Sequence, residues 1–301
     1  MEFTSLFCDV DDFCKVFEPK WRRKLLQSGG RRRRNRKPRL ALSEIMTILI
    51  AFHSSGFRTF KDYYLMLCRQ HRDDFPNLVS YQRFVELMPS TLVPLSGYLM
   101  SRRGENTGVG FIDSTSLAVC GNKRISRNRV FEDVAKIGRS TMGWFFGFKL
   151  HLIINECGEL LAVNVTPGNV DDRSPVRDLT RGIFGKLFGD KGYISQTLFA
   201  ELWDEGLQLI TTIRKNMKPR LIPLWDKLML RKRSLIETVN DQLKNIAQIE
   251  HTRHRSIANF MVNLVAALAS DTHQPKKPTI RFTDEERHLL GIEHQQQLLI
   301  A

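Results

Sequence analysis

Two aspartates stand at positions in this sequence where a carboxylate could hold a metal ion. Asp113 follows the apolar run Gly110-Phe111-Ile112, and Asp190 follows Leu187-Phe188-Gly189. Aspartate is a poor strand residue, so an Asp directly after a strand core either makes a turn or serves as a ligand. A turn before Gly192 would explain Asp190 by itself. The occurrence of two such aspartates on strands of similar composition favours the ligand interpretation.

A third carboxylate, Glu237, lies on a predicted amphipathic helix from Lys232 to Gln248. Its apolar stripe is Ile236, Val239, Leu243 and Ile246, and its polar stripe is Arg233, Glu237, Asn240 and Lys244. Residues three and four positions apart share a helix face. If the two aspartate strands are neighbours and this helix crosses their edge, the three carboxylates complete a site for a divalent metal ion.

Other acidic residues compete for these roles. Glu201 and Glu205 lie on the helix that follows Asp190, so either is a rival to Glu237. Asp171 and Asp172 are interpreted as acids at a helix start, where the helix dipole favours negative charge.

The elements around these residues indicate a mixed sheet. Strands are predicted at 110–119, 143–155, 160–166, 186–189 and 207–213, and helices at 174–180, 196–205 and 232–248. Three strands that precede strands alternating with helices predict an α/β domain whose mixed five-stranded sheet is flanked by helices. The basic segment 123–140 is expected to be a loop or a short helix.

The first third of the chain is predicted to be all-helical. Helices are expected at 10–26, 44–53, 59–70, 80–88 and 92–102, with Ser43 as an N-cap. The second and third have the outline of a helix-turn-helix, and a plain helical bundle explains them equally well. The expected domains are 1–105, helical and DNA-binding, 106–272, catalytic, and 273–301, a polar tail.

The formal charge of +14 and the pI near 9.8 favour a polyanionic partner, and nucleic acid is the commonest. A membrane surface is the second possibility, although no segment is long and apolar enough to span a bilayer. The five cysteines form no CxxC pair, which indicates reduced thiols in a cytoplasm.

One run concentrates this charge. Its basic residues are Arg31, Arg32, Arg33, Arg34, Arg36, Lys37 and Arg39. Such a run repels itself and is expected to be exposed. Phosphate contact is favoured over a merely solvated loop.

The chain resembles the DDE transposases of bacterial insertion sequences. The resemblance rests on Phe111-Ile112-Asp113-Ser114-Thr115, Gly147-Phe148-Lys149-Leu150-His151, Gly189-Asp190-Lys191-Gly192-Tyr193 and Arg233-Ser234-Leu235-Ile236-Glu237. The insertion-sequence family numbered nine-eight-two is the most similar subgroup. A subgroup pattern of Tyr, Arg, Glu and Lys is kept at Arg233, Glu237 and Lys244, whereas Leu230 stands at the Tyr position.

The resemblance implies an RNase H-like catalytic fold in which Asp113, Asp190 and Glu237 are the catalytic metal ligands. It implies Mg²⁺ or Mn²⁺ as cofactor, with two ions ~3.5–4 Å apart. Asp113 would bridge them, and substitution of any of the three by Ala is expected to abolish strand cleavage. The implied reaction is hydrolysis at the transposon end, followed by attack of the freed 3′-hydroxyl on target DNA.

The expected partners are double-stranded DNA, as transposon ends and target, and a second copy of the chain in the active complex. Lys149, Lys191, Arg233 and Lys244 are further predicted DNA contacts. For Arg233 and Lys244, helical charge pairing is an equal alternative. The expected location is the bacterial cytoplasm, at the nucleoid.

Two other functions stay open: an RNase H-like nuclease or resolvase without strand transfer, and an inactive DNA-binding regulator. His251 and His254 are interpreted as helix-end or DNA-backbone residues. Trp144 is expected in the core, and Trp203 and Trp225 are weaker candidates for base stacking.

Overall fold

The computed structural model describes residues 2–27, 38–214, 216–217, 221–250 and 254–290. Contacts within the chain divide it into two compact units. The helical unit comprises residues 1–102 and 242–275, and the sheet unit comprises 103–241 and 276–301. The two units are described separately below.

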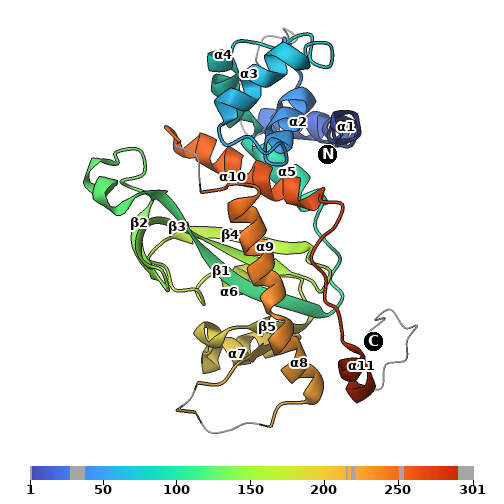
Figure 1. Ribbon diagram of the computed structural model, residues 1–301, viewed down its shortest axis with the longest axis vertical. Helices are drawn as coiled ribbons and strands as arrows, with labels where there is room; N and C mark the ends of the chain where they lie inside the picture. The colour runs from blue at the N-terminus through green and yellow to red at the C-terminus, as the bar shows by residue number, and fades with distance from the viewer. Residues whose placement is uncertain (1, 28–37, 215, 218–220, 251–253, 291–301) are drawn as a thin grey trace. The chain divides into compact units, whose positions relative to one another are not determined.

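The helical unit is built from short helices around an apolar core (Figure 1). Its helices are α1 (Phe3–Gln27), α2 (Leu42–Phe52), α3 (Phe60–Gln70), α4 (Tyr81–Leu87), α5 (Leu92–Ser101) and α10 (Ile257–Thr272). The side chains of Thr59, Ser80 and Ser256 accept hydrogen bonds from backbone N–H groups of α3, α4 and α10, as N-caps do. The predicted all-helical N-terminal region is therefore confirmed.

The start of α2 differs from the prediction. Ser43 is not the N-cap, because the helix begins two residues earlier than predicted, at Leu42, with Ala41 as the N-cap. The Glu44 carboxylate accepts a hydrogen bond of 2.6 Å from the Ala41 N–H. Ser43 is buried, and its hydroxyl hydrogen-bonds Asp11, which is the main cause of the lowered pKa of that carboxyl.

Helix α10 packs with the N-terminal helices, although the sequence analysis placed residues 242–272 in the catalytic domain. Its contacts are with α5 and α2. Nearly every residue from Phe260 to Asp271 is buried, so the helix needs apolar neighbours on all sides. The α2 helix, which is buried over most of its length, provides such a neighbour.

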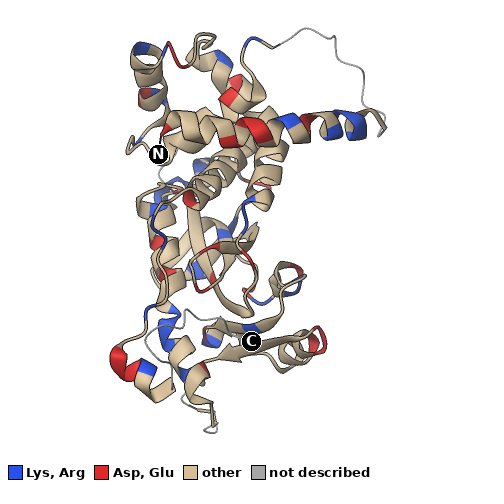
Figure 2. Cartoon of the chain, turned by 90° about the vertical axis from the view of Figure 1, so that its right-hand side faces the viewer, with Lys and Arg blue, Asp and Glu red and all other residues tan. Residues whose placement is uncertain are grey.

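Basic residues gather at the end of α1. Its last two turns carry Lys20, Arg22, Arg23 and Lys24, drawn in blue in Figure 2. Six of the seven predicted DNA contacts of the arginine-rich run, Arg31 to Lys37, lie outside the described residues. Arg39 is described and exposed.

The sheet unit contains a six-stranded mixed sheet. Its strands are β1 (Val109–Cys120), β2 (Lys136–Ser140), β3 (Gly143–Ile154), β4 (Leu160–Pro167), β5 (Gly185–Gly189) and β6 (Leu207–Thr211). The order is β2-β3-β1-β5-β6, and β4 also pairs with β3. Pairing is antiparallel among β1 to β4 and parallel from β1 to β5 and from β5 to β6. The predicted α/β class and mixed sheet are confirmed, with β2 added to the five expected strands.

Helices cover both faces of this sheet. They are α6 (Val176–Leu179), α7 (Gln196–Asp204), α8 (Leu224–Lys232) and α9 (Ser234–Asn245), and a further helix, α11 (Asp284–Leu290), follows near the end of the chain. Ile112 and Ile153 belong to a buried cluster with residues of α6 and α7. Asp113, the next residue along β1, hydrogen-bonds α9. Successive strand residues point to opposite faces, so α9 covers the face opposite α6 and α7.

Residues 276–290, within the predicted polar tail, make specific contacts with the sheet unit. The Ile280 N–H donates to the Glu156 carbonyl at 3.0 Å. Lys232 at the end of α8 pairs with Glu286 of α11 at 2.7 Å. Trp225 stacks on Phe282, with ring centroids 5.8 Å apart, so this Trp is used in packing.

Candidate active site

Asp113 and Asp190 lie on adjacent parallel strands at matching positions. Phe111 of β1 pairs with Phe188 of β5, and each aspartate follows its paired Phe by two residues. The backbone of Asp190 is still extended, with φ −80° and ψ 177°. Two residues along an extended strand return a side chain to the same face, so both carboxylates lie on one face of the sheet.

Their local settings differ. Asp113 lies inside β1, which continues to Cys120, and it pairs across the sheet with Leu152 of β3. Asp190 ends β5 and caps the short turn that follows, because its Oδ1 accepts a 2.8 Å hydrogen bond from the Gly192 N–H. Asp190 thus has the turn role suggested by the sequence and also lies beside Asp113.

Helix α9 and the residue before it bring three side chains to Asp113. The Asn240 Nδ2 donates to Asp113 Oδ2 at 3.0 Å. The Arg233 guanidinium lies 3.7 Å from Asp113 Oδ1 and 2.6 Å from Glu237 Oε1. Arg233 therefore bridges the two acids. Its charge pairing with Glu237, one of the two alternatives, is present in the structure, and its contact with DNA stays a prediction.

Burial raises the pKa of Asp113 to about 6. The positive charge of Arg233 and the Ser114 N–H oppose this rise, whereas the negative charges of Asp190 and Glu237 add to it. Coulombic effects of this kind need close approach, so all three carboxylates belong to one electrostatic site. Perturbed carboxyl groups of this kind are common at functional sites.

The residues at this site suit a hard divalent cation. Asp113, Asp190 and Glu237 offer carboxylate oxygens, which Mg²⁺ and Mn²⁺ prefer. The buried Oδ1 of Asn240 has no hydrogen-bond partner among the described residues, and it adds a neutral oxygen beside Asp113. Within the part of the chain that the structure describes, no three His, Cys, Asp or Glu side chains form a ready-made metal cluster. Arg233 instead occupies oxygens of Asp113 and Glu237.

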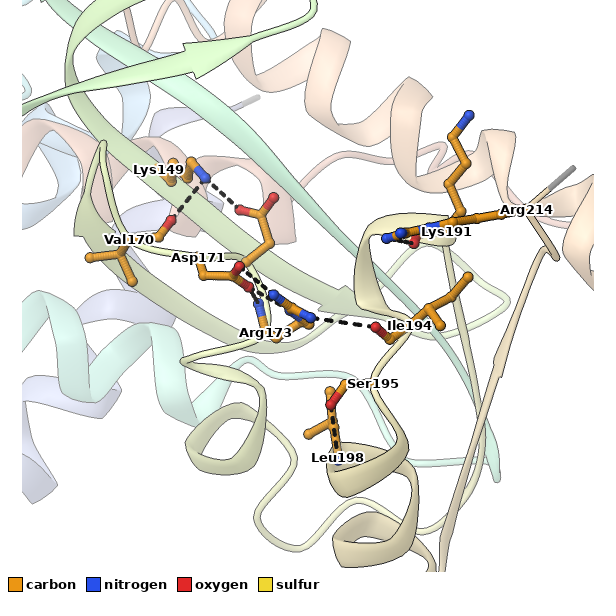
Figure 3. A network of polar contacts seen from close by, with 10 residues as sticks. Lys149, Val170, Asp171, Arg173, Lys191, Ile194, Ser195, Leu198 and Arg214 are labelled. Carbon is orange, nitrogen blue, oxygen red and sulfur yellow. Dashed lines mark hydrogen bonds and ion pairs between the residues drawn. The ribbon is translucent and has the colours of Figure 1, made fainter. Parts of the chain in front are cut away.

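A second polar network, missed by the sequence analysis, lies beside the strand ends (Figure 3). Lys149 donates to Asp172 Oδ1 and to the Val170 carbonyl, both at 2.9 Å. Arg173 binds both oxygens of Asp171, at 2.8 and 2.7 Å, and reaches the Ile194 carbonyl at 3.5 Å. The network ties β3 and the segment after β4 to the loop that follows Asp190.

The prediction that Asp171 and Asp172 are only helix-start acids therefore misses their main contacts. Asp172 pairs with a Lys whose side chain is only 15% exposed. Hydrogen bonds from Arg173 are the main cause of the lowered pKa of Asp171, at about 2. The sequence signal was Lys149 in a largely apolar strand, where a buried Lys needs an acidic partner.

His151 lies in the same strand and is fully buried. Its Nε2 is 2.8 Å from the Thr166 hydroxyl of β4, and burial lowers its pKa to about 4. The ring is therefore neutral at physiological pH.

The remaining predicted residues are spread over both units. Lys191 is exposed, and its carbonyl accepts a bond from Arg214 at 3.5 Å. Lys244 lies 3.4 Å from Glu250. His251 lies outside the described residues, and the His254 ring packs edge-on against Phe260 at 5.6 Å.

Glu201 and Glu205, the rivals of Glu237, lie apart from this site. Glu201 is on α7 and Glu205 is its C-cap, on the opposite face of the sheet, and each carboxylate lies 3.9 Å from the Arg177 guanidinium. All five cysteines, which lie in the described ranges, are free thiols. Among the helices of the described residues, none is long and apolar enough to cross a membrane.

The chain is similar to a solved structure and matches one family of proteins, and only the family match is informative. The crystal structure of the Mos1 strand transfer complex is similar over 86% of this chain and 84% of that chain, at 10% identity. Its TM-score of 0.23 is too low for any conclusion to rest on it. No curated protein matches the chain. The family described as "Transposase DDE domain" matches residues 103–257, just over half of the chain, which therefore belongs to this family.

Proposed function

We propose that the chain is the transposase of an insertion sequence. In this proposal it binds the terminal inverted repeats of its element, cleaves a DNA strand there and joins the freed 3′-hydroxyl to target DNA. The family match supports the transposase class. The observation that carries the enzymatic proposal is the pairing of Phe111 with Phe188, which aligns Asp113 with Asp190 on the face that α9 covers.

In this proposal the residues at the site have three roles: binding metal ions, orienting a carboxylate and supplying positive charge. Asp113, Asp190 and Glu237 would hold Mg²⁺ or Mn²⁺, in agreement with their hard oxygen donors. Bound cations would offset the negative charge that develops at the phosphate during displacement. Asn240 orients the Asp113 carboxylate through its hydrogen bond. Arg233 holds Asp113 and Glu237 together and supplies a positive charge beside the position of the phosphate.

DNA binding at the element ends is assigned to the helical unit, with the basic end of α1 and the arginine-rich run as phosphate contacts. Lys149 is not included in the proposal, because Asp172 and the Val170 carbonyl already use its ammonium group. Lys191 is exposed and is kept in the proposal as a DNA contact. The active complex is proposed to contain at least two copies of the chain, because two DNA ends must be brought together.

The decisive experiment incubates the protein with a labelled duplex that carries one end of its element and an unlabelled target plasmid. We expect a Mg²⁺- or Mn²⁺-dependent cut at the end and a longer product in which the labelled strand is joined to the plasmid. Cleavage without strand joining would contradict the proposal and indicate a nuclease or resolvase. Binding without cutting would replace it by a DNA-binding regulator.

A further inference from the structure

The segment from Gly121 to Trp144 forms a projecting element that the site described above does not use. It contains a 3-10 helix (Asn122–Arg127), strand β2 and the start of β3. We call this segment the basic hairpin. In Figure 1 it is the green loop at the left, which extends away from the sheet beside β2 and β3.

The basic hairpin is anchored to the sheet by buried contacts. Phe131 is 3% exposed and packs edge-on against Phe148 of β3, with ring centroids 6.0 Å apart. Asn122 Nδ2 donates to the Trp144 carbonyl at 3.0 Å. These contacts hold the outer side chains of the hairpin in place.

One face of the hairpin presents large apolar groups to solvent. Arg139 pairs across the strands with Trp144, and Ile137 lies two residues from Arg139 on the same face. Trp144 is 62% exposed and Ile137 is 49% exposed, and Met142 at the turn is 95% exposed. The Arg139 guanidinium lies over the Trp144 ring at 5.7 Å. The prediction that Trp144 belongs to the core was wrong.

The segment that carries this exposed ring is also rich in basic residues. The exposed basic residues of the hairpin are Lys123, Arg124, Arg127, Arg129, Lys136 and Arg139. Its acids are Glu132 and Asp133, and Glu132 pairs with Arg129 at 3.4 Å. The hairpin therefore carries an excess of positive charge, and Arg139 places part of it at an exposed aromatic side chain.

We propose that the basic hairpin is a second DNA-contacting surface, on which Trp144 packs against a nucleotide and the exposed Arg and Lys side chains of the hairpin bind phosphates. This combination of an aromatic platform with positive charge matches nucleic acid, because every base offers a π-face and every nucleotide a phosphate. A second copy of this chain suits the surface less well, since its formal charge is +14. The proposal rests on the proposed function, because DNA is the substrate there.

The position of Trp144 indicates which part of the DNA it contacts. Asp113 pairs with Leu152, which lies eight residues from Trp144 along β3. At ~3.3 Å per strand residue this separation is about 26 Å, or roughly seven to eight base pairs of duplex. For a duplex that runs along β3, the hairpin would therefore contact DNA several base pairs away from the cleaved phosphate.

The test measures binding of a fluorescein-labelled duplex, carrying the element end and its flank, by anisotropy in EDTA so that no cleavage occurs. Trp144→Ala is expected to weaken binding roughly fivefold to hundredfold, and Trp144→Phe, which keeps a ring, by less than about threefold. The matched control is Trp203→Ala, because Trp203 is 65% exposed but lies on α7 between Glu201 and Glu205. Trp203→Ala is expected to bind like the wild type.

Equal affinity of Trp144→Ala, Trp203→Ala and wild type would overturn the proposal. Sedimentation without DNA measures the oligomeric state of Trp144→Ala. If that state changes while the DNA affinity does not, the surface binds a second copy of the chain and the proposal is overturned. If Trp144→Ala fails to fold, Arg139→Gln decides: we expect weaker binding and a salt dependence shallower by about one unit of slope. Unchanged binding by that variant would also reject the surface.

A second assay, cleavage of the same duplex in Mg²⁺, separates this inference from the proposed function. Asp113→Asn should bind DNA like the wild type and fail to cut it. If Asp113→Asn cuts normally while Trp144→Ala loses affinity, the proposed function fails and the DNA-contacting hairpin stands. If Asp113→Asn is inactive and Trp144→Ala binds normally, only the hairpin assignment fails.

Discussion

Asp113 is held where its own ionisation is costly. Its side chain is 21% exposed, and burial raises its pKa to about 6 in spite of the nearby Arg233. An acid whose pKa is higher in the folded state than in the unfolded chain costs stability once the pH exceeds the unfolded value. A residue that lowers stability in this way is common at functional sites, where the requirements of chemistry and folding conflict.

Asp113→Asn is accordingly expected to stabilise the protein at pH 8 by about 1–3 kcal/mol, the free energy that corresponds to a pKa difference of about one to two units. The gain should shrink as the pH falls through about 6 and vanish below about 4, where both states are protonated. Urea unfolding at pH 8 and pH 4 measures it. A gain of equal size at both pH values would show that ionisation of Asp113 is not its source.

Arg233→Gln tests the bridging guanidinium. Removing its positive charge should raise the pKa of Asp113 above about 6, because Arg233 is the largest influence that lowers it. The pH midpoint for Mn²⁺ binding, followed by calorimetry from pH 5 to 8, should move upward. Arg181→Gln is the control, because Arg181 forms a local ion pair with Asp178, at 2.8 Å. An unmoved midpoint would mean that Arg233 does not act on the ionised form of Asp113.

At the scale of elements, the strands that carry the acids could be predicted because each has a continuous apolar core. β2 could not, because Lys136–Ser140 has a single large apolar residue, Ile137, and its pairing with β3 defines it as a strand. Helix α8 was missed for a related reason. It begins after Pro223, and its buried Asp226 is offset by Lys186 of β5 at 2.8 Å, a contact 40 residues away in sequence.

The sequence was enough to name the acids of the candidate site, but not all of the contacts between its residues. Asp113, Asp190 and Glu237 could be grouped because short motifs mark them and because helix periodicity places Arg233 and Asn240 on the Glu237 face. The contact of Asn240 with Asp113 depends on how α9 crosses the sheet, which periodicity does not determine.

Close packing of β1 on β3 depends on a glycine. A Cβ added at Gly147 would lie 1.9 Å from the Leu117 carbonyl oxygen, at the irregularity where the β1–β3 register shifts. Gly147→Ala should therefore cost about 1–3 kcal/mol or more, because rigid backbone must move. Gly121→Ala is the matched control, since nothing lies within 4 Å of its added Cβ and its φ of −68° suits any residue. Urea unfolding should show a change within about 0.5 kcal/mol for this control, and similar values for the two variants would contradict the packing argument.

The Arg173 contacts should restrain the loop after Asp190. Arg173→Ala removes its bonds to Asp171 and to the Ile194 carbonyl, so amide hydrogen exchange in residues 191–195 should accelerate. Cleavage should slow while DNA affinity is retained. Arg181→Ala, which breaks an exposed ion pair outside this network, should leave exchange in that loop unchanged. Unaltered exchange in Arg173→Ala would remove the network from any positioning role.

At the scale of the whole molecule, charge and chemistry are distributed over different parts of the chain. The +14 excess is carried in part by the end of α1, the arginine-rich run and the basic hairpin, whereas the three acids gather at one position of the sheet. Strong salt dependence of DNA binding follows from the charge under any of the three functions, so it does not separate them. The three functions are separated by the reaction that takes place at Asp113, Asp190 and Glu237.

The most direct measurement of the central claim is the single-turnover cleavage rate of an end-containing duplex in Mg²⁺ for matched acid variants. Asp113→Asn, Asp190→Asn and Glu237→Gln should each lower the rate at least about a hundredfold, without loss of DNA affinity. Glu201→Gln and Glu205→Gln, helix carboxylates on the opposite face of the sheet, should cut within about twofold of the wild type. Normal cleavage by any one of the first three would remove that residue from the site, and normal cleavage by all three would contradict the account.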